Sequence, residues 1–351
     1  MKTVFKNLCV DGRITDITAE NGIIKKVGTV SEPGIDFHGM RAYPGLIDIH
    51  THGMGGMDTM DADFELMAEL QAKNGTTTFF PTTMTASHED ILRVLTAPLP
   101  DKGARLEGFH LEGPYINEKY KGAQNSAYVR RPDIDEFKAF DNVKLITIAP
   151  EAEGAEEFIK NSRAVICLGH TDADYETAMR AARAGAKCLT HTFNAMPPLH
   201  HRQPSLIGAA FDSDMYVQVI CDGKHIHPSV IRILYKLFGA DRMILISDSM
   251  RATGLCDGDY EFGGLTITVK DKTARTQDGA LAGSTSTLFE CVRCATEFGI
   301  PESDAFKMAS ETPARLMGLN RGKIFAGYDC DLIVLNDKNE IDTVIIGGKI
   351  I

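Results

Sequence analysis

The 351-residue chain lacks an excess of positive charge and lacks long apolar runs, and both absences exclude classes of function. It has 37 Lys and Arg against 48 Asp and Glu, a formal net charge of −11. Unassisted nucleic-acid binding needs a basic face and is not expected, although local Arg and His side chains can still attract a small anion. No apolar run approaches the ~18 residues of a membrane-spanning helix, so no membrane association is expected either.

The chain also lacks the apolar core of a signal peptide, because strand-like pattern starts within its first residues. We therefore expect a cytoplasmic protein. Most of its eight cysteines lie in apolar segments, where reduced thiols pack as small hydrophobic groups. Cys291 and Cys294 form a C-x-x-C pattern within a helical stretch, but without a second pair nearby core packing is favoured over a redox or zinc role.

Near-continuous apolar segments between Pro44 and Asp248 predict eight parallel strands that are buried on both faces. Helical segments separate them, and one has Pro228 in its first turn and Gly239 at its end. Eight alternations of strand and helix favour an α/β fold of the (β/α)8 TIM-like barrel type over a doubly wound open sheet. The predicted strands span 45–50, 76–83, 105–112, 143–150, 164–170, 187–194, 215–222 and 242–248.

The two ends of the chain contain short strand-like segments instead. Asp11-Gly12 and Asn21-Gly22 are typical hairpin turns near the start, and two apolar strand-like segments follow Gly322. Neither end is long enough for a core of its own. We therefore expect residues 1–43 and 320–351 to form one small β-sandwich domain and residues 44–319 to form the barrel.

Histidines and carboxylates follow several of the predicted strands. His50 and His52 lie on one side of the first strand, since side chains alternate along a strand. Barrel enzymes build their active sites at the carboxyl ends of the strands, so these polar side chains should meet. Imidazole and carboxylate donors without thiolate predict a site for zinc, iron or manganese. Later strands supply, in chain order, Glu112, His170, His191 and Asp248.

Three longer motifs carry a resemblance to a known family. They are His110-Leu-Glu-Gly-Pro-Tyr115, His191-Thr-Phe-Asn-Ala-Met-Pro197 and Leu281-Ala-Gly-Ser-Thr285. Together with the His-x-His pair they resemble the amidohydrolase superfamily and, within it, the N-acetylglucosamine-6-phosphate deacetylase family. The similarity spans essentially the whole chain. It implies metal-dependent hydrolysis of the N-acetyl group of N-acetylglucosamine 6-phosphate, which releases acetate and glucosamine 6-phosphate.

The resemblance also implies the metal ligands. Glu112, His170 and His191 match the principal metal site of the family, and His50 and His52 match the first-strand pair of the superfamily. Some members lack that pair and bind one metal, so one or two zinc or iron ions per subunit are expected here. No lysine ends the fourth predicted strand, and the resemblance implies that Glu112 takes the bridging role, as it does in the family.

Two catalytic roles follow from the same resemblance. Asp248 would take a proton from water and pass it to the departing nitrogen, and His225 would polarise the acetyl carbonyl. From the residues alone, a surface-loop histidine is an equally good interpretation of His225. His110 shares a face with Glu112, and both a supporting and a purely structural role remain open for it.

The loop after the sixth strand is the expected phosphate site. Arg202 can contact two phosphate oxygens, and the backbone at Asn194 and Ala195 can add donors. In the family the matching arginine reaches the neighbouring subunit, which implies a homodimer, whereas the residues alone favour a solvated loop charge at Arg202. The remaining expected substrate-binding residues are Ala123, Gln124, His225, Ala282 and Gly283.

Some alternatives remain open. Family members often have histidine where this chain has Gln124, which leaves the sugar epimer undecided. Ala282 and Gly283 could instead belong to a turn before a helix that starts near Ser284. The enzyme could be another amidohydrolase, acting on a different epimer, a cyclic amide or an N-acyl amino acid. An inactive barrel acting as an interaction module is disfavoured, because no candidate ligand is missing.

Overall fold

Eight parallel strands form a closed ring in the computed structural model, which describes residues 2–351. Each strand pairs with the next one along the ring. The ring closes where the Asp248 N–H donates to His50 O at 2.9 Å and the His52 N–H donates to Ser249 O at 2.8 Å. The predicted barrel is thereby confirmed, and the open sheet is excluded. The strands are β6 (Leu46–Thr51), β9 (Thr76–Thr83), β11 (Phe109–Glu112), β12 (Val143–Ile148), β13 (Val165–Leu168), β14 (Cys188–Leu189), β15 (Tyr216–Ile220) and β16 (Met243–Ile246), with β10 (Arg105–Leu106) beside β9.

The strands are apolar on both faces because two cores use them. Ile47 and Ile49 of β6 pack into the barrel interior with Phe80 and Ile246, while Leu46 packs outward against the helices. Each fully buried side chain of this size stabilises the fold by about 1.5–3 kcal/mol. Burial on both faces therefore explains the continuous apolar runs that the sequence shows.

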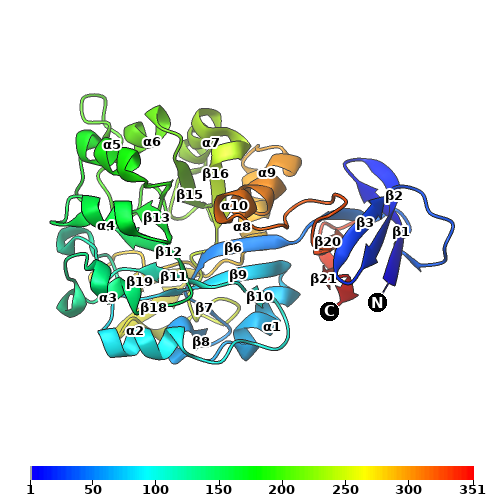
Figure 1. Cartoon of the computed structure of the whole chain (residues 1–351), viewed down its shortest axis with the longest axis horizontal. Coiled ribbons are helices and arrows are strands. Elements are labelled where there is room, and N and C mark those ends of the chain that lie inside the picture. Colours follow the sequence, from blue (N-terminus) through cyan, green and yellow to red (C-terminus); the bar gives the residue numbers. More distant parts are fainter. Residues whose placement is uncertain (1) are drawn as a thin grey trace.

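Helices cover the outside of the ring (Figure 1). One of them, α7, begins at Pro228 after the His227 N-cap, as predicted, and Gly239 with φ +61° interrupts it near its end. No helix within residues 2–351 has both the length and the apolar character needed to span a membrane. The helices are α1 (Glu65–Lys73), α2 (His88–Leu95), α3 (Ile134–Lys138), α4 (Ala155–Asn161), α5 (Tyr175–Ala184), α6 (Ser205–Asp212), α7 (Pro228–Arg242), α8 (Leu288–Glu297), α9 (Glu302–Met308) and α10 (Glu311–Met317), with 3₁₀ turns at Thr59–Asp61, Glu118–Tyr120 and Ser126–Tyr128.

The helix expected near Ser284 begins later, at Leu288. Thr287 caps it, and Glu290 completes a reciprocal capping box with the Thr287 backbone. Ser284 is instead held beside the end of β16, since its N–H donates to Asp248 O at 2.7 Å and its carbonyl accepts from the Met250 N–H at 2.9 Å. This segment therefore extends the strand-end network next to the candidate site.

The two ends of the chain share one sheet, which lies beside the barrel (Figure 1). The C-terminal strand β20 runs antiparallel to β5, with Ile333 opposite Tyr43. The turn at Asp11 and Gly12 has positive φ at both residues, as the predicted hairpin requires. The strands are β1 (Lys2–Val10), β2 (Arg13–Glu20), β3 (Ile23–Val27), β4 (Ile35–Asp36), β5 (Arg41–Pro44), β20 (Leu332–Leu335), β21 (Ile341–Ile346) and β22 (Lys349–Ile350).

The terminal sheet has its own apolar core, and Phe5 and Ile345 from opposite ends of the chain both belong to it. This core supports the proposed division into a discontinuous domain of residues 1–43 and 320–351 and a barrel of residues 44–319. Met1 lies outside the described residues. The exact boundaries stay a proposal, because β5 ends at Pro44, which pairs with Leu332.

A three-stranded antiparallel sheet, which the sequence analysis missed, is formed by the segment that connects β16 to α8 along the chain. It consists of β17 (Gly258–Phe262), β18 (Leu265–Lys270) and β19 (Thr273–Thr276). Ile267 and Val269 of β18 are buried between exposed residues, an alternation typical of a strand that the sequence contains. Phe262 at the end of β17 contacts the His52 ring edge-on, with ring centroids 5.2 Å apart. A short hairpin of β7 (Gly53–Met54) and β8 (Met57–Asp58) follows β6.

Candidate active site

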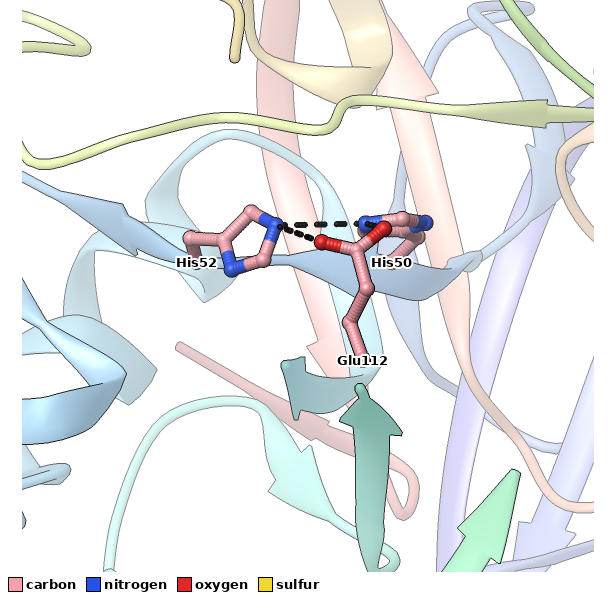
Figure 2. Close-up of side chains that lie close together, drawn as sticks. All are labelled: His50, His52 and Glu112. Atoms are coloured by element: carbon pink, nitrogen blue, oxygen red, sulfur yellow. Dashed lines mark hydrogen bonds and ion pairs between the residues drawn. The ribbon is translucent and has the colours of Figure 1, made fainter. Parts of the chain in front are cut away.

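Five candidate metal ligands converge at the carboxyl ends of the barrel strands. Two groups of three donors share Glu112, the last residue of β11. His50 and His52 form the first group with it, and Figure 2 shows both rings directed at its carboxylate. His170 and His191 form the second group, each two residues beyond its strand. The predicted side chains therefore do meet, and all five are buried.

The hydrogen bonds of three histidines leave their Nε2 atoms as acceptors. In His50, His52 and His170 the Nδ1 atom lies beside a carbonyl oxygen, so Nδ1 carries the proton and Nε2 does not when the ring is neutral. These acceptors are, respectively, Gln218 Oε1 at 3.1 Å, Thr82 O at 3.0 Å and Tyr120 O at 2.8 Å. Neutral rings would thus direct lone pairs at the carboxylate of Glu112 and at one another.

A positive charge is needed where these lone pairs meet. The Nε2 atoms of His50 and His52 are 3.2 Å apart, and those of His170 and His191 are 3.0 Å apart. The two acceptors of His50 and His52 repel at this distance unless a proton or a metal cation lies between them, whereas a neutral His191, whose Nδ1 has no hydrogen-bond partner among the described residues, can carry its proton on Nε2. Imidazole and carboxylate donors suit a divalent metal, especially where hydrogen bonds at Nδ1 hold the imidazole rings in place, as they do here for three histidines. The donor set therefore fits one or two ions.

The charges of the titratable groups agree with this fit. Burial alone would lower the pKa of His52, but its hydrogen bonds to Asp248 and Glu112 raise the pKa to about 10. Burial alone would raise the pKa of Glu112, but the surrounding histidines hold it well below its ordinary value. The same competition lowers the pKa of Asp248 to about 2. Both carboxylates are therefore ionised, and together they attract a cation.

Asp248 is placed to act on a molecule in this site. It lies two residues beyond β16, and its Oδ1 is 3.3 Å from His52 Nε2 and 3.5 Å from His50 Nε2. Its backbone is fixed by the ring-closing hydrogen bonds to β6 and by its carbonyl, which accepts from the Ser284 N–H. A carboxylate held this firmly can accept and return a proton without moving far.

His225 is held by a carboxylate that the sequence analysis did not single out. Asp222 Oδ2 accepts from His225 Nδ1 at 2.7 Å, while Asp222 Oδ1 accepts from the backbone N–H groups of Lys224 and His225 at 2.9 Å. Both side chains are almost buried, and His225 lines the cavity. This geometry favours the functional interpretation of His225 over a free surface-loop residue, since a paired ring is fixed in orientation.

His110 is engaged elsewhere. Its Nδ1 donates to Ile49 O at 3.1 Å, and its Nε2 accepts from Thr147 Oγ1 at 2.8 Å, which in turn bonds Thr190 Oγ1. The ring packs edge-on against His50 at 4.6 Å between centroids. Of the two roles considered for His110, a supporting one is therefore favoured, in which its ring packs against the candidate metal ligand His50.

A cavity of about 400 Å³ opens over these ligands. Its wall includes Ala123, Gln124, Asn194, Ala195 and Gly283 among the expected substrate-binding residues. The Asn194 N–H already donates to His191 O at 2.9 Å, so it is not available to a phosphate in the way the sequence suggested. Ala282 lies behind the wall, in an apolar cluster with the β17–β19 sheet.

Arg202 lies outside the cavity of its own subunit. It is exposed, bonds His201 Nε2 at 2.8 Å and lines a separate surface groove beside Asp174 and Tyr175. Within the wall of the cavity, as the described residues define it, Lys119 is the single Lys or Arg. The sequence analysis missed Lys119, because nothing in its local pattern separates it from a solvated loop charge.

Comparisons with known proteins show which family the chain belongs to. The amidohydrolase family matches residues 41–351, and the chain therefore belongs to that family. An N-acetylglucosamine-6-phosphate deacetylase of Bacillus subtilis is 39% identical over 88% of this chain and 83% of the relative. With identity at this level, the chain belongs, within the amidohydrolases, to the N-acetylglucosamine-6-phosphate deacetylase family.

Two further similarities bear on substrate. A structure of the Mycobacterium smegmatis N-acetyl-D-glucosamine-6-phosphate deacetylase, a variant in complex with N-acetyl-D-glucosamine-6-phosphate, matches with a TM-score of 0.91 at 30% identity and covers 99% of both chains. An N-acetylgalactosamine-6-phosphate deacetylase of Escherichia coli O157:H7 is 32% identical over 88% of this chain and 86% of the relative. Relatives of this similarity therefore include two sugar epimers.

Proposed function

We propose that this protein is a metal-dependent deacetylase that hydrolyses N-acetylglucosamine 6-phosphate to glucosamine 6-phosphate and acetate. The observation that carries the proposal is the convergence of Glu112 with two histidine pairs and Asp248 at the floor of one cavity. Family membership with deacetylases along nearly the full chain supports the same substrate class. A catalytically inactive barrel would not need to keep this set intact.

The metal site is assigned to Glu112, His50, His52, His170 and His191. A divalent cation bound there would lower the pKa of a water molecule and polarise the acetyl carbonyl, because it is a Lewis acid. Both zinc and iron suit imidazole and carboxylate donors, and the two donor groups can hold one ion or two. Glu112, which belongs to both groups, would join the two positions.

Asp248 and His225 carry the proton and charge changes of the reaction. Asp248 is ionised and takes a proton from the attacking water, whose oxygen forms the new bond to the acetyl carbon. It then returns the proton to the sugar nitrogen as the C–N bond breaks, so that a neutral amine leaves. His225, whose Nδ1 donates to Asp222, would donate from Nε2 to the carbonyl oxygen as a doubly protonated imidazolium when negative charge develops there.

The phosphate end of the substrate would lie away from the metal ligands. Lys119 brings positive charge to the cavity wall of the same subunit, where its Nζ pairs with Asp172 at 2.7 Å. The backbone at Ala195 contributes to the same wall. Arg202, which does not reach its own cavity, would contribute from the neighbouring subunit, and this forms part of the proposal of a homodimer.

The galactosamine epimer is a second candidate substrate. The 32% identical relative named for N-acetylgalactosamine 6-phosphate supports this second substrate.

A cytoplasmic location is also proposed, and eight unpaired cysteines support it, since reducing compartments keep thiols free.

Acetate release tests the proposal. Purified protein should release acetate from N-acetylglucosamine 6-phosphate faster than from the galactosamine epimer and far faster than from unphosphorylated N-acetylglucosamine. Chelation should abolish release, and zinc or iron should restore it. Full metal content with no release from any of the three sugars would refute the function and leave the metal site standing.

A further inference from the structure

Gln124 lies against the carboxylate that joins the two candidate ligand groups. Its Nε2 donates to Glu112 Oε2 at 2.6 Å, and its Oε1 accepts from the Thr85 N–H at 2.6 Å. The residue is 2% exposed. It lies in the loop that follows β11, between the 3₁₀ turns at Glu118–Tyr120 and Ser126–Tyr128. Both ends of the amide are therefore occupied by protein groups.

The backbone donor determines which way the amide faces. The Thr85 N–H can only donate, so the carbonyl oxygen of Gln124 must face it and the NH₂ group must face Glu112. Thr85 itself follows β9 and is buried, which gives the amide a rigid support. A side chain fixed in this way holds its neighbour in one orientation.

The two oxygens of Glu112 are thereby given different surroundings. Oε1 lies 3.3 Å from His50 Nε2, 3.3 Å from His170 Nε2 and 3.0 Å from His191 Nε2. Oε2 lies 3.3 Å from His52 Nε2 and accepts from Gln124. The amide thus adds a donor of fixed position on the Oε2 side of the carboxylate, opposite the three histidines that face Oε1.

We infer that Gln124 is a positioning residue that orients Glu112 between the two ligand groups, rather than a residue that recognises a sugar hydroxyl. The inference rests on the proposed function to the extent that Glu112 binds a metal. It differs from the expectation drawn from the sequence, in which Gln124 was a substrate-binding residue. A second-layer hydrogen bond to a metal-binding carboxylate fixes ligand geometry and strengthens binding.

Glutamine suits this position because it is neutral and has both a donor and an acceptor. A glutamate would place a second negative charge beside Glu112 and could not donate while ionised. An asparagine, shorter by one methylene, would not span from Thr85 to Glu112. Methionine keeps the length and flexibility of glutamine but removes both hydrogen bonds, so Gln124→Met isolates their contribution.

Metal affinity measured without substrate is the first test. Competition with a chelator of known affinity, followed by metal analysis of the protein, should show roughly 10- to 100-fold weaker binding in Gln124→Met than in wild type. Gln124→His, which retains an N–H donor, should recover part of that loss. Asn125→Ala is the matched control, because Asn125 caps its own 3₁₀ turn and does not bond Glu112; its metal affinity should equal that of wild type.

Kinetics with the metal-saturated enzyme separates the two roles. Positioning predicts a lower kcat for Gln124→Met with a KM for the sugar phosphate within about twofold of wild type. Wild-type metal affinity together with a raised KM would overturn the inference and make Gln124 a sugar contact. Failure of wild type itself to release acetate would instead refute the proposed function, whereas the metal-affinity comparison would still decide the role of Gln124. If Gln124→Met does not fold, Gln124→Leu, which also lacks both hydrogen bonds, is compared with Asn125→Ala, and equal metal affinities would refute the inference.

Discussion

Replacing Asp222 by asparagine tests how His225 acts. In the structure the Asp222 carboxylate bonds the His225 ring at 2.7 Å and two backbone N–H groups at 2.9 Å. Burial alone would raise the pKa of Asp222, but the hydrogen bond to His225 lowers it. Asp222 therefore places a negative charge beside the His225 ring. In the proposed reaction the other ring nitrogen, Nε2, donates a hydrogen bond to the substrate.

The size of the effect follows from what asparagine keeps. Its oxygen can still accept from the Lys224 and His225 N–H groups, so the turn should survive. Its NH₂ group would then face Nδ1, which leaves the single ring proton on Nε2 and keeps a neutral donor. What the variant loses is the negative charge beside the ring. A hydrogen bond to a charged group contributes about 1.5–3 kcal/mol and a neutral one about 0.5–1.5 kcal/mol, and the expected loss is the difference between the two. A difference of about 1.5 kcal/mol corresponds to roughly tenfold in kcat.

Steady-state kinetics at saturating metal is the assay. The Asp222→Asn variant should show kcat lowered about tenfold, with KM for N-acetylglucosamine 6-phosphate little changed, since the interaction strengthens only as charge develops. Circular dichroism and metal content should match wild type. An unchanged kcat in a folded, metal-loaded variant would refute the charge argument, and a changed KM with unchanged kcat would make His225 a ground-state binding residue.

Three other perturbations give separate checks. Asp248→Asn should keep fold and metal content but lower turnover roughly 10²- to 10⁴-fold, since an amide cannot carry the proton; near-normal kcat would remove that role. Arg202→Ala should mainly raise KM for the phosphorylated sugar, and an unchanged KM would remove Arg202 from the phosphate site. Asp16 bonds Lys6 Nζ at 2.9 Å, which lowers the carboxyl pKa from 3.8 to about 2. Because the folded-state pKa is the lower one, Asp16 contributes about 2 kcal/mol above pH 4 that is lost as the pH falls towards 2. Amide hydrogen exchange in β1 and β2 should therefore separate Asp16→Asn from wild type at pH 6 and less at pH 3, and a constant difference would contradict this origin.

The barrel and its ligands were predictable because both depend on short-range rules. Strands buried on two faces have continuous apolar runs, and the carboxyl ends of parallel strands in a ring meet at one edge. The side-chain alternation that puts His50 and His52 on one side needs only two residues of strand. Family resemblance then supplied roles for Asp248 and His225 that spacing could not.

Most of the site features that the sequence did not reveal depend on contacts between segments that are distant along the chain. One of them, Asp222, belongs to a short local pattern. Gln124 reaches Glu112 only because its loop folds back against Thr85, and no local pattern encodes that return. Lys119 enters the cavity wall through the same loop. Asp222, in contrast, lies three residues before His225, and an Asp-x-x-His turn after a strand was a signal that could have been used.

The backbone at the strand ends shows why local preference alone would misplace these residues. His170, His191 and Asp248 each lie two residues past a strand and have φ of +48°, +26° and +46°, in the left-handed region. Non-glycine residues there cost about 1–2 kcal/mol each, and glycine would be the residue that local preference selects. The sequence has histidine and aspartate at these positions instead, and all three side chains line the cavity. These three positions therefore trade backbone stability for site geometry, and substitutions there should remove activity while costing less stability than comparable changes in the buried strands.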